Sequence, residues 1–407
     1  MTARKSPSKK SETVSISKVP AIGKESVAWH KKYGGKLGTY SKVPLKDSHD
    51  YSLAYTPGVA QVSLELARDP KMASVLSLKK NSLAVISDGS KVLGLGNLGA
   101  YGAIPVMEGK CVLFKELGGI DAFPICIQTQ DVGEIISIIR NISPVFGAIN
   151  LEDIKAPNCF KVEAALQDLG IPVFHDDQHG TAIVTYAALL NASKVAKKPF
   201  SSLRVCINGA GAAGNAIAKM LLGKGLPASA PRVKEVIICD SKGIIYRGRK
   251  DLDADKAELA AMTNPKNKKG LLVDALRGMD AFIGVSIANQ VSEEMVRSMA
   301  AKAIVLAMAN PTPEIMPDVA KRGGALVVGT GRSDYPNQVN NALAFPGIFR
   351  GAMDANATHI TPHMELAAAR ALAGMVSSPT AGMILPPLSD RRVAHVVAAA
   401  VRSAVKS

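Results

Sequence analysis

The chain has 407 residues, of which 47% are apolar, 20% charged and 4% aromatic. This composition excludes a disordered or collagen-like chain, and no apolar run reaches the ~18 residues of a membrane span. The formal net charge is +15, but positions 1–46 hold 11 basic and 2 acidic residues and carry +9 of it. The sequence shows no stripe of aromatic residues among the basic ones, as a stacking platform for nucleic acid would need, so we expect no nucleic-acid partner. We expect a small anionic substrate as the partner.

Residues 1–24 form a basic, Ser-rich extension that we expect to be disordered. The extension lacks the apolar core of a secretory signal, and its acid-poor composition leaves two locations open, the cytoplasm and a mitochondrion-like organelle. The cysteines form no CxxC pair and indicate a reducing compartment. They are Cys111, Cys126, Cys159, Cys206 and Cys239.

Residues 25–195 are predicted to form a first domain that mixes helices and strands. Two strands, at 81–90 and 91–99, are predicted to pair as a hairpin with Asp88–Gly89 at its turn. A helix at 131–142, strands at 145–153 and 171–177, and a helix from about 180 to 196 follow from the apolar periodicity.

Residues 196–407 are predicted to form a second domain, which begins beside a linker at 197–202. Strands at 203–208, 233–240, 280–286, 303–310 and 325–331 alternate with helices, which predicts right-handed βαβ units and a parallel sheet. A helix capped by Thr361–Pro362 and an Ala/Val-rich helix end the chain. The predicted fold class is α/β, with an N-terminal α/β domain followed by a Rossmann-type domain.

A glycine-rich turn at 209–214 has the context that pyrophosphate binding requires. A strand precedes it, a helix follows it, and an acidic residue closes the next strand. The predicted cofactor contacts are Gly209, Gly211, Ala212, Ala213, Gly214 and Asp240. A second GxGxxG, at 94–99, lacks this context, because its strand is expected in a hairpin and Pro105 is expected to stop a helix. We interpret it as a closely packed backbone turn.

Asp240 leaves the choice between NAD and NADP open. A carboxylate at this position accepts from the ribose hydroxyls and disfavours a 2′-phosphate. Lys242 and Arg249 lie nearby in the sequence and could offset that repulsion, so we predict use of both cofactors, with Lys242 as the residue that favours NADP.

Two pairs of carboxylates, Glu152–Asp153 and Asp176–Asp177, follow two apolar strands. If the pairs converge at one end of a sheet, they repel one another unless a cation is present. Oxygen-only ligands favour Mg²⁺ or Mn²⁺. A competing interpretation uses His175 and His179 as ligands of a zinc hydrolase, although the HExxH glutamate is missing.

Two further residues are candidates for proton transfer. Lys110 lies in an apolar stretch, where burial would lower its pKa towards the range of a general base. Tyr55 precedes a Pro-Gly turn that would hold its phenol in place as a proton donor.

Nine segments then make the sequence recognisable: LAYTPGVA, VLGLGNLG, PVMEGKCVLFK, INLEDIKAP, VFHDDQHGTA, GAGAAG, CDSKG, ANPTPE and TGRSDYPNQVNNALAFPGIFRGAMD. In this order, from about Glu25 to near Leu388, they resemble the malic enzyme family in its short, prokaryotic-type form. The resemblance implies oxidative decarboxylation of (S)-malate to pyruvate and CO₂ with reduction of NAD(P)⁺, with oxaloacetate decarboxylation as an additional activity. It also implies a homodimer or a higher homo-oligomer.

The resemblance assigns roles residue by residue. Tyr55 would be the general acid and Lys110 the general base, with Asp176 supporting the site. Glu152, Asp153 and Asp177 would hold the metal ion. Asn310 would contact the cofactor or substrate, and Asn340 or Asn341, together with Lys110, would contact malate. Lys91 stands where larger relatives have a substrate-binding arginine; it keeps the charge and loses the bidentate fork. A two-domain NAD(P)-dependent dehydrogenase of another small acid is the alternative within the oxidoreductases.

Overall fold

The computed structural model describes residues 22–405. The predicted extension therefore lies outside the described residues up to position 21, while residues 22–24 belong to the first helix. Within the described part, no helix is both long enough and apolar enough to cross a membrane.

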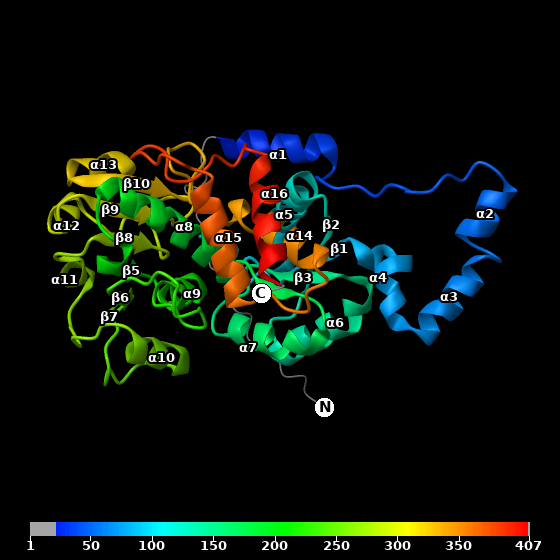
Figure 1. Ribbon diagram of the computed structural model, residues 1–407, viewed down its shortest axis with the longest axis horizontal. Helices are drawn as coiled ribbons and strands as arrows, with labels where there is room; N and C mark the ends of the chain where they lie inside the picture. The colour runs from blue at the N-terminus through cyan, green and yellow to red at the C-terminus, as the bar shows by residue number, and fades with distance from the viewer. Residues whose placement is uncertain (1–21, 406–407) are drawn as a thin grey trace, which may run out of the picture.

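A four-stranded parallel sheet, in the order β2-β1-β3-β4, organises the N-terminal part (Figure 1). The elements of this part are α1 (Ile22–Tyr33), α2 (Ser48–Ala54), α3 (Val59–Arg68), α4 (Ala73–Leu76), β1 (Ser82–Ser87), α5 (Gly99–Gly118), β2 (Asp121–Cys126), α6 (Val132–Ile142), β3 (Ala148–Leu151), α7 (Asn158–Ala165), β4 (Val173–His175) and α8 (His179–Ala196). Strand β1 is buried on both faces. Leu83 and Val85 join the core beneath α5 and α8, while Ala84 and Ile86 pack with α6 and α7. The near-continuous apolar run of this strand is typical of a covered parallel sheet.

A second sheet, in the order β10-β9-β8-β5-β6-β7, organises the C-terminal part and is parallel except for β7. Its elements are β5 (Arg204–Asn208), α9 (Ala212–Leu221), β6 (Glu235–Asp240), β7 (Gly243–Ile244), α10 (Ala254–Met262), α11 (Leu272–Leu276), β8 (Ala281–Gly284), α12 (Glu293–Arg297), β9 (Ala303–Ala307), α13 (Pro317–Arg322), β10 (Ala325–Thr330), α14 (Phe345–Asp354), α15 (Pro362–Gly374) and α16 (Arg392–Ala404). Thr361 caps α15 through its hydroxyl, as predicted. The predicted α/β fold class is confirmed.

The last helices return to the first sheet. Phe345 and Phe349 on α14 pack against Phe114 on α5, with ring centroids 4.7 and 5.4 Å away. Helix α8 lies in the same apolar core as both sheets. This shared core holds the carboxyl ends of the two sheets towards each other.

The N-terminal helices α2 and α3 form an arm that stands away from both sheets, at the right of Figure 1. None of the residues in α1 to α4 is buried. An extended connection joins α1 to α2 (Figure 1). The arm therefore exposes apolar side chains that a compact monomer would cover.

The predicted hairpin at 81–99 is wrong. Strand β1 pairs in parallel with β2 and β3, and the following segment makes only an isolated bridge between Val92 and Gly96. Helix α5 then runs for 20 residues through Pro105. An interior proline costs about 3 kcal/mol, whereas each large apolar side chain that is fully buried contributes about 1.5–3 kcal/mol. The buried stripe Met107, Cys111 and Phe114 therefore outweighs the proline.

The second glycine motif is a closely packed backbone turn, as interpreted from the sequence, although the hairpin and proline arguments for it were wrong. A Cβ at Gly94 would lie 2.0 Å from the carbonyl oxygen of Asn310. The turn thus lets the chain of the first domain approach the backbone of the second.

Candidate active site

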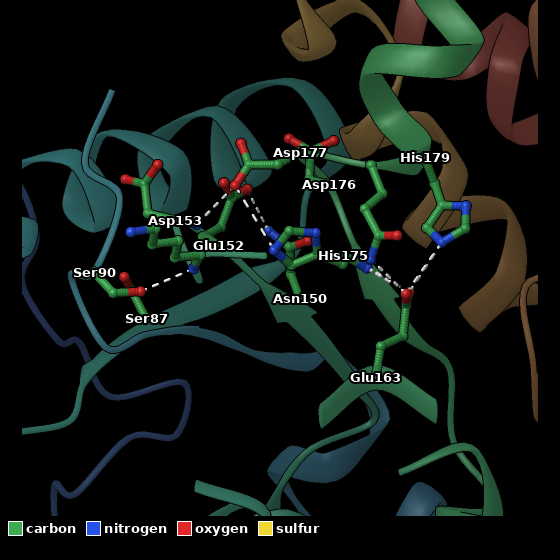
Figure 2. Close-up of polar contacts among 12 residues, drawn as sticks. Ser87, Ser90, Asn150, Glu152, Asp153, Glu163, His175, Asp176, Asp177 and His179 are labelled. Atoms are coloured by element: carbon green, nitrogen blue, oxygen red, sulfur yellow. Dashed lines mark hydrogen bonds and ion pairs between the residues drawn. The ribbon is translucent and has the colours of Figure 1, made fainter. Parts of the chain in front are cut away.

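The two carboxylate pairs meet at one edge of the first sheet (Figure 2). Strand β3 ends at Leu151, before Glu152 and Asp153, and the adjacent parallel strand β4 ends at His175, before Asp176 and Asp177. The backbone N–H of Asp153 donates to Asp177 Oδ2 over 2.8 Å, which joins the two pairs directly.

Burial makes this cluster electrostatically costly. Glu152, Asp153 and Asp176 are each at most 5% exposed. Burial and the neighbouring Asp177 raise the pKa of Asp153 to about 8. Burial, reinforced by the surrounding carboxylates, also holds the pKa of Glu152 well above its usual value. Clustered carboxylates of this kind are stabilised by positive charge.

Lys110, on α5, supplies one such charge. Its Nζ lies 2.5 Å from Asp176 Oδ2 and 2.9 Å from Glu152 Oε1. Burial alone would lower the pKa of this lysine, but the attraction of Asp176 and Glu152 outweighs burial and holds the pKa above its ordinary value. The prediction that burial brings Lys110 towards neutrality is therefore wrong for the protein by itself, because the sequence argument left out the facing carboxylates.

The donor chemistry fits a hard divalent cation. Asp153 Oδ2 and Asp176 Oδ1 are buried oxygens without a hydrogen-bond partner. Among residues 22–405, no three His, Cys, Asp or Glu side chains already stand in a metal-ligating arrangement, and the Lys110 ammonium lies between two of the carboxylates. The fit thus rests on the oxygen-only donor set and on these two unpaired atoms.

The two histidines do not form a zinc site. The ring nitrogens of His179 lie 3.1 Å from Glu163 and 2.8 Å from Glu365, so both are engaged by carboxylates. His175 is buried on the Asp177 side, with its Nε2 3.7 Å from Asp177 Oδ2. The zinc hydrolase interpretation is wrong, because the His179 ring contacts Glu163 and Glu365 whereas the His175 ring lies beside Asp177 (Figure 2).

A cavity of about 490 Å³ collects most of the predicted substrate and metal residues. Its lining includes Lys91, Lys110, Glu152, Asp153, Asp177, Asn310, Asn340 and Asn341. Asp176 is fully buried and is bonded to Lys110. Ala213 and Ser286 of the second domain close the opposite wall. The cavity therefore lies between the two domains.

Tyr55 is the predicted site residue that the chain does not bring to this cavity. It caps the C-terminal end of α2, on the projecting arm, and is 72% exposed. In the single chain, its phenol therefore faces solvent and does not contact Lys110.

A second cavity, of about 700 Å³, lies over the glycine-rich turn. Gly209, Gly211 and Asp240 line it, and Ser286 lines both this cavity and the carboxylate cavity. Ala212 is buried at the start of α9. A Cβ at Gly214 would lie 1.8 Å from the Gly209 carbonyl oxygen, so the turn requires glycine there. The N-terminus of α9 offers free N–H groups, as a pyrophosphate site requires.

Two cations contact Asp240. Arg249 Nη2 lies 2.9 and 2.8 Å from its two oxygens, and Lys256 Nζ lies 3.1 Å from Oδ2. Lys242 Nζ instead pairs with Asp251 at 2.8 Å. Lys256 lines the nucleotide cavity and Lys242 does not.

Two family models agree with this arrangement, one for each domain. Residues 34–167 match the family described as "Malic enzyme, N-terminal domain", and residues 178–406 match "Malic enzyme, NAD binding domain". The chain belongs to the malic enzyme family. The predicted resemblance is thereby confirmed.

Individual relatives cover nearly the whole chain. It is 51% identical over 388 residues to the bifunctional malic/malolactic enzyme of Bacillus subtilis, covering 94% of this chain and 93% of that one. Identity to the NADP-dependent malic enzyme of Halomonas elongata is 46% over 357 residues, covering 87% and 82%. The crystal structure of the NAD-dependent malic enzyme of Thermotoga maritima matches with a TM-score of 0.88 and 46% identity, covering 93% and 98%.

Sequence reasoning missed Lys36 and Lys256. Lys36 lines the carboxylate cavity, and its Nζ donates to the Pro105 carbonyl over 2.5 Å. It lies in the irregular segment after α1, where no periodicity pointed to α5. Lys256 lies on α10, which follows β6 and β7. The only sequence feature that could have indicated its position is the alternation of strands and helices, which places this helix near the end of β6, where Asp240 lies.

Proposed function

We propose that the protein oxidatively decarboxylates (S)-malate to pyruvate and CO₂ with reduction of NAD⁺ or NADP⁺. One observation carries this proposal. The carboxylate cavity holding Lys110 and the cavity over the glycine-rich turn share Ser286 as a wall, so substrate and dinucleotide sites adjoin. Family membership favours the same reaction over the dehydrogenation of another small acid.

The carboxylates Glu152, Asp153 and Asp177 would hold Mg²⁺ or Mn²⁺. Bound there, the ion would act as a Lewis acid on the malate hydroxyl, and NAD(P)⁺ would accept the hydride. Lys91 faces the same cavity and would bind a malate carboxylate as a point charge. Asn340 and Asn341 line the cavity as neutral hydrogen-bonding groups and orient the substrate.

Lys110 would remove the hydroxyl proton at its Nζ. Its position between Glu152 and Asp176 keeps the amine aimed into the cavity. Because these carboxylates stabilise the ammonium, Lys110 becomes a base only when their charge is offset. Asp176, fully buried behind it, would hold the amine in place through both proton states.

Tyr55 would protonate C3 after CO₂ has left, and we propose that it does so in the site of a second copy. The phenol is 72% exposed on an arm that stands away from its own sheets (Figure 1). The same arm exposes Leu53 and Leu64, which are 63% and 53% exposed. Exposed apolar surface of this kind favours burial against another chain. A symmetric dimer would place each arm on the partner's body.

Both cofactors would be used. Asp240 suits the ribose hydroxyls of NAD⁺, while Lys256 and Arg249 balance its charge and reduce the repulsion of a 2′-phosphate. We place the reaction in the cytoplasm, because all five cysteines are free thiols and thus fit a reducing compartment.

The proposal is tested by incubating the protein with (S)-malate, Mn²⁺ and either NAD⁺ or NADP⁺. We expect NAD(P)H and pyruvate in equal amounts, and complete loss of both on addition of EDTA. NAD(P)H without pyruvate would favour a simple dehydrogenase, and turnover that resists EDTA would contradict the metal role.

A further inference from the structure

The turn that carries Asp176 and Asp177 is held from behind by one buried carboxylate (Figure 2). Glu163, on α7, accepts from the backbone N–H of His175 over 2.9 Å and from Gln178 Nε2 over 2.7 Å. His179 Nε2 lies 3.1 Å from the same side chain. Three groups that flank the two aspartates on both sides therefore converge on Glu163.

The front and the back of this turn are tied to the same stretch of chain. At the front, Asp177 Oδ2 accepts from the backbone N–H of Asp153. At the back, Glu163 belongs to α7, which follows Asp153 after a short connection. The segment from Asp153 to Glu163 thus forms hydrogen bonds with the turn at both of its ends. We infer that these bonds set the distance between the two carboxylate pairs.

Glu163 is suited to this position by its charge. Its side chain is only 13% exposed, and although burial alone would raise its pKa, His179 and the hydrogen bonds hold the pKa below the usual value. An ionised carboxylate has enough lone pairs to accept from all three groups at once. Glu365, on the other side of His179, contacts the ring at 2.8 Å.

We propose that Glu163 is a positioning residue that fixes the turn 175–179 so that Asp176 and Asp177 face the cation site and Lys110. The inference rests on the metal-dependent function proposed above. It assigns Glu163 no contact with substrate, and it predicts that losing this side chain weakens the metal site without weakening the nucleotide site.

The decisive variant is Glu163→Met, which keeps the length of the side chain and removes its acceptors. Loss of hydrogen bonds that orient metal ligands typically weakens metal affinity by about 10–100-fold, and we expect a loss in that range for Mn²⁺, although Glu163 orients Asp177 only through its chain neighbours. Affinity is measured by electron paramagnetic resonance of free Mn²⁺, together with NADH binding and the thermal midpoint. NADH affinity should be unchanged, because the glycine-rich turn lies on the other domain.

Glu365→Met is the matched control. It removes the same group from the other side of His179 and leaves all three donors to Glu163 in place. We expect its Mn²⁺ affinity to stay within about threefold of the unchanged protein, well below the effect of an outer-contact loss. Equal losses of Mn²⁺ affinity in the two variants would overturn the proposal. They would indicate that removing a negative charge beside His179 weakens Mn²⁺ binding, whether or not the donors to Glu163 keep their acceptor.

The Met side chain in the variant would adjoin a cavity of about 410 Å³, which Glu163, Gln178 and His179 line, so we expect the variant to fold. If Glu163→Met is nonetheless insoluble, Glu163→Gln carries the test. Its one carbonyl oxygen can still accept from His175 but cannot accept from all three donors, so we expect a smaller loss of Mn²⁺ affinity, about 3–10-fold. Unchanged affinity in a folded Glu163 variant would overturn the positioning role alone. If the wild-type protein binds no Mn²⁺, the proposed function and the positioning role are both overturned.

Discussion

The placement of Tyr55 on an exposed arm makes a prediction that separates action in its own chain from action in a partner. Two variants, Tyr55→Phe and Lys110→Ala, each remove one proton-transfer group, and each alone should lower turnover by about 10²–10⁴-fold. Mixed after subunit exchange, they should recover activity, because Lys110 of one chain then meets the partner's intact tyrosine.

The size of the recovery follows from the symmetry of a dimer. Random exchange of equal amounts makes about half of the dimers mixed, and each mixed dimer has one site with both groups intact and one site with neither. The mixture should therefore regain about a quarter of the wild-type turnover per chain, at least 25-fold above either variant alone.

The assay follows pyruvate formation at saturating malate, Mn²⁺ and cofactor before and after exchange. Tyr51→Phe is the matched control, since it removes an exposed phenol from the same helix and should remain fully active. Exchange that occurs without any recovery would refute action in the partner's site. Normal turnover of Tyr55→Phe would refute its role as the acid.

Three further predictions concern the two cavities. Asp177→Asn should abolish Mn²⁺ binding and leave NADH binding intact, measured by paramagnetic resonance and by NADH fluorescence; retained Mn²⁺ affinity would exclude it as a ligand. Gly214→Ala should do the reverse, because its Cβ would lie 1.8 Å from the Gly209 oxygen; undiminished NADH binding would contradict the pyrophosphate site. Lys256→Ala should lower kcat/KM about fivefold for NADP⁺ alone, which corresponds to ~1 kcal/mol for one exposed charge contact, whereas Lys242→Ala should not. An equal loss of kcat/KM for NAD⁺ in Lys256→Ala would show that Lys256 does not contact the 2′-phosphate.

The carboxylate cluster could be predicted from sequence because it depends on topology alone. Glu152 and Asp176 follow two buried apolar strands, and the carboxyl ends of adjacent parallel strands share an edge. The glycine-rich turn could also be predicted, because its strand, turn and helix lie within about 20 consecutive residues. Neither inference needed knowledge of which side chains face each other across the fold.

Helix α5 and the charge of Lys110 could not be predicted in this way. Pro105 argues locally against a helix, and the burial that outweighs it includes the packing of Phe114 against Phe345, from the far end of the chain. The pKa of Lys110 depends on Asp176, 66 residues away, whose position is set by a different strand. Both errors arose from energies that belong to tertiary contacts.

The charges in the cavity explain why a divalent ion is expected there. Glu152 and Asp176 flank the Lys110 ammonium, and Asp153, which is 5% exposed, lies beside them without a lysine of the described chain within salt-bridge distance. Burial, reinforced by the neighbouring carboxylates, raises the pKa of Asp153 to about 8 and holds that of Glu152 well above its usual value. A divalent cation bound there would stabilise both carboxylates in their ionised form and would weaken the hold of Glu152 on the Lys110 ammonium. The charge that would bind a metal ion at this edge would therefore also prepare the lysine to act as the proposed base.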